Sequence, residues 1–354
     1  GELLAFMSTA MFISSPYLGA LADRVGMKRI FVFMPFCYGM SQLIFGFGMN
    51  LPLIFLARMI SGFASGGTFA VAFGYVSQLS EKEEKAKNIA KVSSATVIGG
   101  AIGQKIGGYV ATAMNDPRFS FALQFIGGSI VSIIILLVMK EIVKKDNKLE
   151  EEKNKKDLNP FATFRYIKEL DGYSKFFCLI ILLSGIGIYS YGSALNYFLK
   201  FYKKVSSDTI GTFVMCSSLL AFFGTAFLLG KLLKKFKEKS IYKFLIFVGI
   251  ILMAVILFRV KFGVTPYLLM ALYTMTYEIV RSLGNTIIAQ RYKENQGKIL
   301  GVASAVGSLG TAIGSLLSGH LLAFNPFLPF VMNIGVMTLV LILILYSNFA
   351  RLNK

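Results

Sequence analysis

Tryptophan is absent from this 354-residue chain, histidine occurs once, and only 16% of the residues are charged. The chain is instead 55% hydrophobic, with a mean hydropathy of +0.65. A soluble domain cannot bury so much apolar sequence and still cover its surface with polar side chains. The composition therefore excludes a soluble globular protein and predicts one that crosses a membrane several times.

Residues that carry catalytic or metal chemistry are also scarce. The single histidine, His320, stands near the outer end of an apolar segment, and the cysteines lack metal-type spacing: Cys37, Cys178 and Cys216. The sequence contains no phosphate-binding loop, no nucleophile motif and no cluster of His, Asp and Glu. We therefore expect no disulfide framework, no metal, no cofactor and no enzymatic activity.

Long apolar runs fill most of the chain. A helix needs about 20 mostly apolar residues to cross a hydrocarbon layer of ~30 Å. Eleven segments meet this need, at approximately 1–21, 31–48, 52–78, 90–113, 119–139, 173–199, 209–230, 244–258, 266–290, 298–323 and 327–347. Several are apolar throughout, without the alternation of a barrel strand. We predict an all-α polytopic membrane protein.

Positive charge dominates the polar loops, since 37 Lys and Arg stand against 18 Asp and Glu. Most of these cations fall in alternate loops, at 22–30, 79–91, 140–172, 231–243, 291–298 and 349–354. Cations accumulate on the cytoplasmic side of spanning helices. We therefore predict that these loops and the C-terminus face the cytoplasm, and we expect no nucleic-acid partner.

One long polar stretch, residues 140–172, interrupts the apolar pattern. Its mixed charges and its lack of aromatic residues over EIVKKDNKLEEEKNKKDLNP are typical of a linker. It separates residues 1–139, with five predicted spans, from residues 173–354, with six. Because the run at Gly1 would begin outside, we expect one further helix upstream, which completes two six-helix bundles such as transporters use.

Three short motifs stand out in this pattern. GALADRVGMKR carries the residues of a known loop between helices 2 and 3: Gly19, Leu21, Asp23, Arg24, Gly26, Lys28 and Arg29. LARMISGFASG resembles a fourth-helix motif through Arg58 and Gly62. GGAIGQKIGG resembles a fifth-helix antiporter motif, with Gln104 in place of the usual proline. With these motifs the chain resembles the major facilitator superfamily, in its drug:proton antiporter (multidrug efflux) branch, lacking the first helix.

This resemblance implies the major facilitator fold, with residues 1–139 as family helices 2 to 6 and residues 173–354 as helices 7 to 12. It implies a monomer in the cytoplasmic membrane that exports small amphipathic compounds against inward proton flow. It also implies that Asp23 and Arg24 latch the halves together at the start of the helix near Gly297. A carboxylate at a helix N-terminus is favourable. The alternative is an ordinary positively charged loop.

The fifth-helix motif supplies a row of glycines. Gly99, Gly103 and Gly107 recur every fourth residue, so they share one helix face and let another backbone approach closely. In the family this face packs against the opposite half, whereas plain helix contact is the alternative. The motif also contains Gly108, and Gln104 should leave the helix straighter than a proline would.

Ionisable side chains well inside the spans are few: Arg58, Lys105, Glu278 and Arg281. Each is costly in hydrocarbon, so each should face a cavity or another of the group. Glu278 lies about 18 Å into the span that starts near Pro266, and Arg281 follows on the same face. We predict that Glu278 carries the coupling proton with Arg281, and the resemblance adds Arg58. A permanent ion pair is the alternative.

Further side chains are predicted to meet the substrate. Lys105 is either a counter-ion for an anionic substrate or a lysine that snorkels to the surface. Polar and aromatic residues suited to amphipathic molecules complete the group: Tyr191, Asn196, Tyr273, Tyr277 and Asn285. A sugar or organic-anion facilitator or symporter, favoured if Lys105 binds substrate, and a transport-inactive receptor or assembly subunit remain as alternatives.

Overall fold

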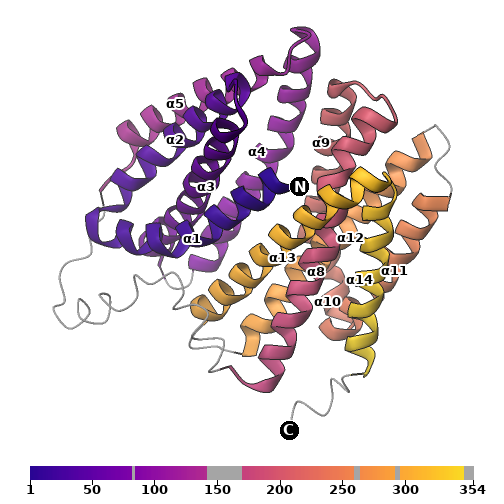
Figure 1. The fold of residues 1–354 in the computed structure, drawn as a ribbon. Coiled ribbons are helices and arrows are strands. Elements are labelled where there is room, and N and C mark those ends of the chain that lie inside the picture. Colours follow the sequence, from indigo (N-terminus) through magenta and orange to yellow (C-terminus); the bar gives the residue numbers. More distant parts are fainter. Residues whose placement is uncertain (82–83, 142–169, 259–263, 292–295, 347–354) are drawn as a thin grey trace. The chain divides into compact units, whose positions relative to one another are not determined.

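The computed structural model describes residues 1–81, 84–141, 170–258, 264–291 and 296–346. These residues form helices joined by short connections, and no strand occurs among them (Figure 1). The α-helices are α1 (Glu2–Val25), α2 (Met27–Phe47), α3 (Leu51–Leu79), α4 (Lys85–Ala113), α5 (Arg118–Val138), α8 (Gly172–Tyr197), α9 (Ser207–Phe223), α10 (Leu229–Lys235), α11 (Glu238–Phe258), α12 (Val264–Arg291), α13 (Gln296–Phe324) and α14 (Leu328–Tyr346). Two π-helical segments, η1 (Phe198–Tyr202) and η2 (Gly224–Leu228), extend α8 and connect α9 to α10.

Each of the predicted apolar segments coincides with one helix or with a continuous run of helices, so the all-α prediction is confirmed. The prediction of a polar loop at 22–30 is wrong in extent. Helix α1 continues through Val25 and α2 starts at Met27, so Gly26 alone separates them. Gly26 has φ +112°, a conformation that only glycine adopts without strain, and it turns the chain within one residue.

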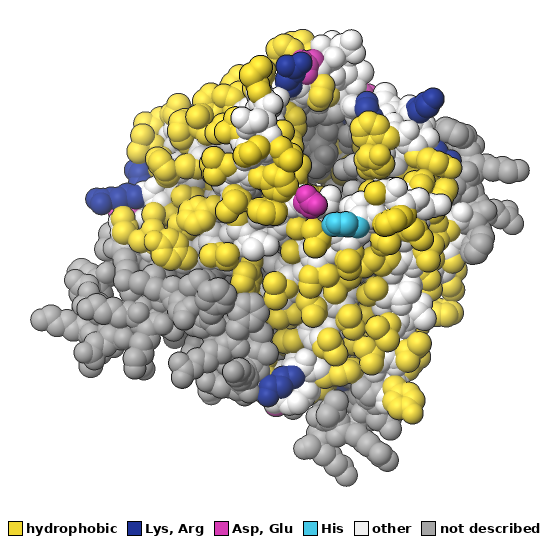
Figure 2. Space-filling view, in the orientation of Figure 1, with side chains coloured by type: hydrophobic (Ala, Val, Ile, Leu, Met, Phe, Trp, Pro, Cys, Tyr) yellow, Lys and Arg dark blue, Asp and Glu magenta, His cyan; other side chains and the backbone are white. Residues whose placement is uncertain are grey.

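Eight helices in the described residues are long and apolar enough to cross a membrane. Large apolar side chains stay exposed on several of them, including Phe33 on α2, Leu137 on α5 and Phe244 on α11. Hydrophobic side chains also cover most of the described surface on the face that Figure 2 shows. Such surfaces suit hydrocarbon, which agrees with the predicted membrane protein.

The helices form two compact units, which we describe separately. The N-terminal unit comprises Leu3–Thr96 and Ile106–Ala162. The C-terminal unit comprises Gly1–Glu2, Val97–Lys105 and Thr163–Lys354. The division into residues 1–139 and 173–354 around a linker stays a prediction.

Glycines bring helices together inside the N-terminal unit. A Cβ added to Gly39 of α2 would lie 2.9 Å from the Cα of Phe125 on α5, and one at Gly128 of α5 would lie 2.5 Å from the Pro35 carbonyl oxygen. Gly66 of α3 likewise lies against the Met11 carbonyl of α1, where an added Cβ would come to 2.6 Å. Small residues therefore permit the close packing that substitutes for hydrophobic attraction within a membrane.

The C-terminal unit is built around the contact of α8 with α13. A Cβ at Gly310 of α13 would lie 2.6 Å from the Leu182 carbonyl oxygen, and one at Gly314 would lie 2.5 Å from that of Ile186. Phe177 of α8 is fully buried, and its cluster extends to Ile279 on α12. Helix α12, which carries Glu278 and Arg281, is thus held by its apolar face.

Candidate functional site

The ionisable pair of α12 is formed as the sequence spacing predicts. Arg281 Nη2 lies 2.7 Å from Glu278 Oε2, and Arg281 Nε donates a hydrogen bond to the same oxygen at 3.0 Å. The two residues are one helical turn apart, so α12 alone fixes their geometry. The Glu278 side chain is 27% exposed and that of Arg281 56% exposed. The carboxylate is therefore partly covered and still open on one side.

Tyrosines surround this pair. Tyr277 of α12 lies close enough to interact electrostatically with Glu278 and Arg281, and Tyr189 of α8 lies close enough to interact with Tyr277 and Arg281. A phenol can donate or accept a hydrogen bond. The four side chains thus form one polar group on α8 and α12.

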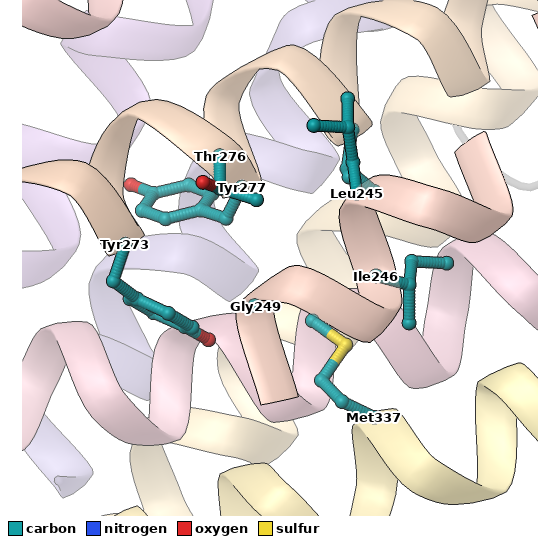
Figure 3. A pocket seen from close by; sticks show the side chains of 8 residues that line it. Leu245, Ile246, Gly249, Tyr273, Thr276, Tyr277 and Met337 are labelled. Atoms are coloured by element: carbon teal, nitrogen blue, oxygen red, sulfur yellow. The ribbon is translucent and has the colours of Figure 1, made fainter. Parts of the chain in front are cut away.

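A small apolar pocket adjoins the group within the C-terminal unit (Figure 3). Its lining comes from α11, α12 and α14, namely Leu245, Ile246, Gly249, Tyr273, Thr276, Tyr277, Val280 and Met337. Its cavity volume is about 10 Å³. Pockets for drug-sized ligands hold about 300–1,000 Å³. This pocket alone is therefore too small for such a ligand.

Two of the predicted substrate residues belong to the core of this unit. Tyr191 is 1% exposed and Tyr273 2% exposed, and their rings meet edge to face at 4.8 Å between centroids. The Tyr273 hydroxyl donates to Asn333 Oδ1 at 2.9 Å, and Asn333 Nδ2 donates to the Gly187 carbonyl at 2.6 Å. Tyr191 and Tyr273 thus join α8, α12 and α14, and a role for either in binding substrate stays a prediction.

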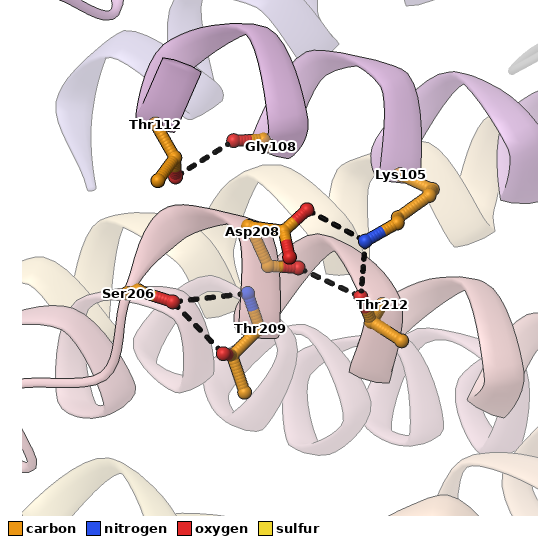
Figure 4. A network of polar contacts seen from close by, with 7 residues as sticks. All are labelled: Lys105, Gly108, Thr112, Ser206, Asp208, Thr209 and Thr212. Atoms are coloured by element: carbon orange, nitrogen blue, oxygen red, sulfur yellow. Dashed lines mark hydrogen bonds and ion pairs between the residues drawn. The ribbon is translucent and has the colours of Figure 1, made fainter. Parts of the chain in front are cut away.

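Lys105 has a carboxylate partner. Its Nζ lies 2.6 Å from Asp208 Oδ1 and donates to Thr212 Oγ1 at 2.8 Å (Figure 4). Asp208 and Thr212 lie in the first turns of α9, where the Ser206 hydroxyl accepts from the Thr209 amide and caps the helix. An acid in this position also suits the helix dipole. Two of the three ammonium donors of Lys105 are therefore already engaged.

Arg58 of α3, in the N-terminal unit, is stabilised in the described structure by an aromatic ring and not by a carboxylate. Its guanidinium carbon lies 3.6 Å from the centroid of the Phe45 ring on α2. Its Nε is buried and has no hydrogen-bond partner among the described residues. Tyr38 of α2 lies close enough to interact electrostatically with Arg58, and Tyr38 shares a side-chain hydrogen bond with Gln42. Arg58 is therefore a half-buried cation beside two aromatic rings.

Comparison with known proteins identifies the family to which this arrangement belongs. The family model described as Major Facilitator Superfamily matches residues 1–301 and 177–351. The chain belongs to the major facilitator superfamily. It is accordingly a membrane transporter for small molecules, with several spanning helices, and not an enzyme.

The curated relatives of this transporter include bacterial resistance proteins. The chain is 25% identical to "Multidrug resistance protein 2" of Bacillus subtilis (strain 168), over 93% of this chain and 81% of that protein. It is 22% identical to "Quinolone resistance protein NorA" of Staphylococcus aureus (strain MRSA252), over 100% of this chain and 89% of that protein. These relatives support a place in the plasma membrane.

A solved structure confirms the fold. The crystal structure of the human organic anion transporter MFSD10 superimposes with a TM-score of 0.65 at 16% sequence identity, covering 97% of this chain and 83% of that one. At this identity the likeness speaks for the architecture alone. The prediction of the major facilitator fold is confirmed.

The 19–29 motif of this transporter spans the junction of α1 and α2. Asp23 and Arg24 lie in the last turn of α1, but their side chains are outside the described part of the structure. Gly19 is half-buried on α1, and Arg29 is exposed on α2. The predicted contact of Asp23 near Gly297 also lies outside the described side chains, so the latch stays a prediction.

The glycines of the fifth-helix motif lie on α4, which runs unbroken through Gln104. A Cβ added to Gly99, Gly103 or Gly107 would meet no described atom within 4 Å. The close helix packing that their spacing predicts is therefore not seen here, because a shared face does not itself provide a neighbour. The Gly108 carbonyl accepts from the Thr112 hydroxyl within the helix. An interface role for the motif stays a prediction.

Two further residues, Asn196 and Asn285, are predicted to contact the substrate, and neither has a described contact with the site. Asn196 is exposed near the end of α8, and Asn285 lies in α12 with its side chain outside the described set. The structure also adds residues that the sequence analysis missed: Phe45, Glu141, Asp208 and Asn333. An acid two residues after a capping serine was a usable signal for Asp208. Nothing in the sequence linked Phe45 to Arg58.

Proposed function

We propose that this transporter exports small amphipathic compounds in exchange for protons, by alternating access. The names of its relatives, which concern multidrug and quinolone resistance, support export of drug-like molecules. The observation that carries the proposal is the Glu278–Arg281 pair on α12. It provides one carboxylate whose charge changes on protonation, on a helix whose apolar face is packed into the core of the C-terminal unit.

The proposed coupling follows from electrostatics. Deprotonated Glu278 is stabilised by Arg281 at 2.7 Å, whereas protonation removes the attraction and frees the guanidinium. Tyr277 and Tyr189 lie near the guanidinium of Arg281, so their hydroxyl groups can accept a hydrogen bond from it when the pair opens. A cationic compound that approaches the carboxylate favours its deprotonated form. Substrate and proton therefore compete for Glu278, which is the requirement for exchange.

Other parts of the proposal rest on the motifs. Asp23 and Arg24 close the cytoplasmic side while the carrier is open outward, and the C-terminus lies in the cytoplasm. The protein works as a monomer. Lys105 is engaged by Asp208 and Thr212. Because Asp208 already balances the charge of Lys105, the pairing does not favour a sugar or organic-anion symporter.

The test is transport by the full-length gene product in everted membrane vesicles with an imposed pH gradient. Addition of an exported dye or fluoroquinolone should release protons from the vesicle lumen. Glu278→Gln keeps the shape of the side chain and removes its titration, so it should abolish proton release while compound binding persists. Unchanged coupled export by Glu278→Gln would reduce the pair to a structural role.

A further inference from the structure

The turn between α1 and α2 is held from outside its own sequence. Gly26 is the N-terminal flanking residue of α2, with φ 112° and ψ 131°, and it has no side chain to cap the helix. The first backbone amides of a helix need acceptors from elsewhere. At this helix start the acceptor comes from residue 141, which follows α5.

Glu141 supplies that acceptor. Its Oε1 accepts a hydrogen bond from the backbone amide of Lys28 at 3.1 Å, across 113 positions of sequence. The carboxylate also lies directly against Gly26. A Cβ added to Gly26 would clash with Glu141 Oε1 and would come within 2.8 Å of its Cδ. Glycine is therefore required here twice, by the backbone conformation and by the space that the carboxylate occupies.

The charges around this contact favour the carboxylate. The first turn of α2 contains no acidic residue, and it carries the basic residues Lys28 and Arg29. Cations at a helix N-terminus are unfavourable, because the backbone dipole is positive at that end. The Glu141 carboxylate brings a negative charge to this helix start, which the dipole favours. A charge-assisted bond of this kind is about twice as strong as a neutral one.

A second contact ties the same stretch to α3. The Tyr75 hydroxyl, near the end of α3, donates to the Lys140 carbonyl at 3.2 Å. Beneath it, Ala22, Met27 and Val71 form a buried cluster that joins α1, α2 and α3. Residues 140 and 141 are also the first residues of the predicted linker. The start of the linker thus lies at the 19–29 motif.

We propose that Glu141 is a positioning residue for the 19–29 motif, and that it fastens the start of the linker to that motif. It fixes the orientation of the α1–α2 turn by holding the Lys28 amide with its carboxylate. This inference rests on the proposed function insofar as the motif acts as a cytoplasmic latch. The contact itself can be tested without transport.

Hydrogen exchange of the purified full chain in nanodiscs tests the contact directly. In Glu141→Ala the Lys28 amide should exchange about five to thirty times faster than in the wild type, because it loses its acceptor. Glu141→Gln should give a smaller increase, since its amide oxygen still accepts but carries no charge. Tyr75→Phe removes only the bond to Lys140 and should also give a small increase.

Glu81→Ala is the matched control, because Glu81 is exposed in another connection of the same unit and no contact of its side chain with a described residue is seen. It should leave exchange at Lys28 unchanged. The proposal is overturned if Glu141→Ala and Glu141→Gln both leave the Lys28 amide protected, or if Glu81→Ala exposes it equally. If Glu141→Ala does not fold, the comparison of Glu141→Gln with the wild type still tests the proposal.

Transport kinetics show whether Glu141 positions the 19–29 motif or only stabilises the folded protein. Glu141→Gln should lower kcat for export severalfold with KM unchanged, because the motif acts on the conformational step and not on substrate contact. A parallel rise in KM would contradict the positioning role. Glu278→Gln should leave exchange at Lys28 as in the wild type. If the protein does not export compounds, the hydrogen-exchange result at Lys28 is still valid. If Glu141 does not protect the Lys28 amide, the export proposal is still valid.

Discussion

Arg58 and Arg281 show two ways to keep an arginine inside a membrane protein. Arg281 is held by the carboxylate of Glu278 on its own helix, with 2.7 Å between the charged atoms. Arg58 lies over the Phe45 ring of a neighbouring helix, at 3.6 Å from the centroid. The ring offers a permanent quadrupole, whereas the carboxylate can be neutralised by a proton.

This difference assigns different tasks to the two units. The environment of Arg58 does not change charge with pH, so Arg58 supplies a constant positive potential within the N-terminal unit. The environment of Arg281 changes by one charge whenever Glu278 is protonated. Proton coupling is therefore expected on α12, and Arg58 is expected to tune it or to contact substrate. Lys105, paired with Asp208, resembles Arg281 in chemistry but draws its partner from a distant segment.

The largest effect is expected from Arg281→Met, which removes the cation and keeps a long apolar side chain. Glu278 then loses both contacts that its Oε2 makes with the guanidinium. Because an unpaired carboxylate is costly inside a membrane protein, export should persist weakly, if at all, without dependence on the pH gradient. Export measured with and without the gradient checks this.

Arg281→Lys is the control, since it retains the charge but not the two-pronged geometry. It should keep part of the gradient dependence. Full gradient-driven export by Arg281→Met would show that the pair does not take part in coupling.

An intermediate effect is expected from Asp208→Asn. The pair with Lys105 is 34% exposed at each side chain, so its loss should lower the stability of the purified protein by about 1 kcal/mol. It should also release Lys105, so that compounds bearing a carboxylate bind more tightly than to the wild type. Thermal unfolding and competition binding measure the two effects.

The double variant Lys105→Met with Asp208→Asn provides the comparison. It should lose the gain in binding while it stays as stable as Asp208→Asn. A gain in carboxylate binding that survives in the double variant would mean that Lys105 is not the group released.

The smallest effect is expected from Phe45→Leu, which removes the ring beneath Arg58. A cation–π contact contributes about 0.5–2 kcal/mol. Phe36→Leu on the same helix is the matched control. Phe36 contacts the Phe125 ring of α5 as Phe45 contacts that of Phe121, but only Phe45 has a described arginine over its ring. The free energy of unfolding should fall more in Phe45→Leu than in Phe36→Leu, and an equal fall in both would mean that aromatic packing alone accounts for the contribution of Phe45.

Contacts within one helix could be predicted from the sequence, and contacts between helices could not. Glu278 and Arg281 are three residues apart, so helical geometry sufficed to join them. Lys105 and Asp208, or Lys28 and Glu141, are more than a hundred positions apart. Their pairing depends on how whole helices pack, which hydropathy does not encode.

The glycine motifs make the same point. Gly99 and Gly103 have the same spacing as Gly310 and Gly314, yet only the second pair lies against a neighbouring backbone. Tyr191 and Tyr273 were likewise predicted from their chemistry to contact substrate, and the structure places them in the core. Periodicity shows which residues share a face, whereas the identity of the partner decides what that face does.

The most direct test of the account is the number of protons released when an exported compound binds to the purified full-length transporter. Titration calorimetry in two buffers of different ionisation enthalpy gives this number. We expect both proteins to bind the compound, with proton release from the wild type and none from Glu278→Gln. Equal proton release from Glu278→Gln would contradict the account, because another group would then carry the coupling proton.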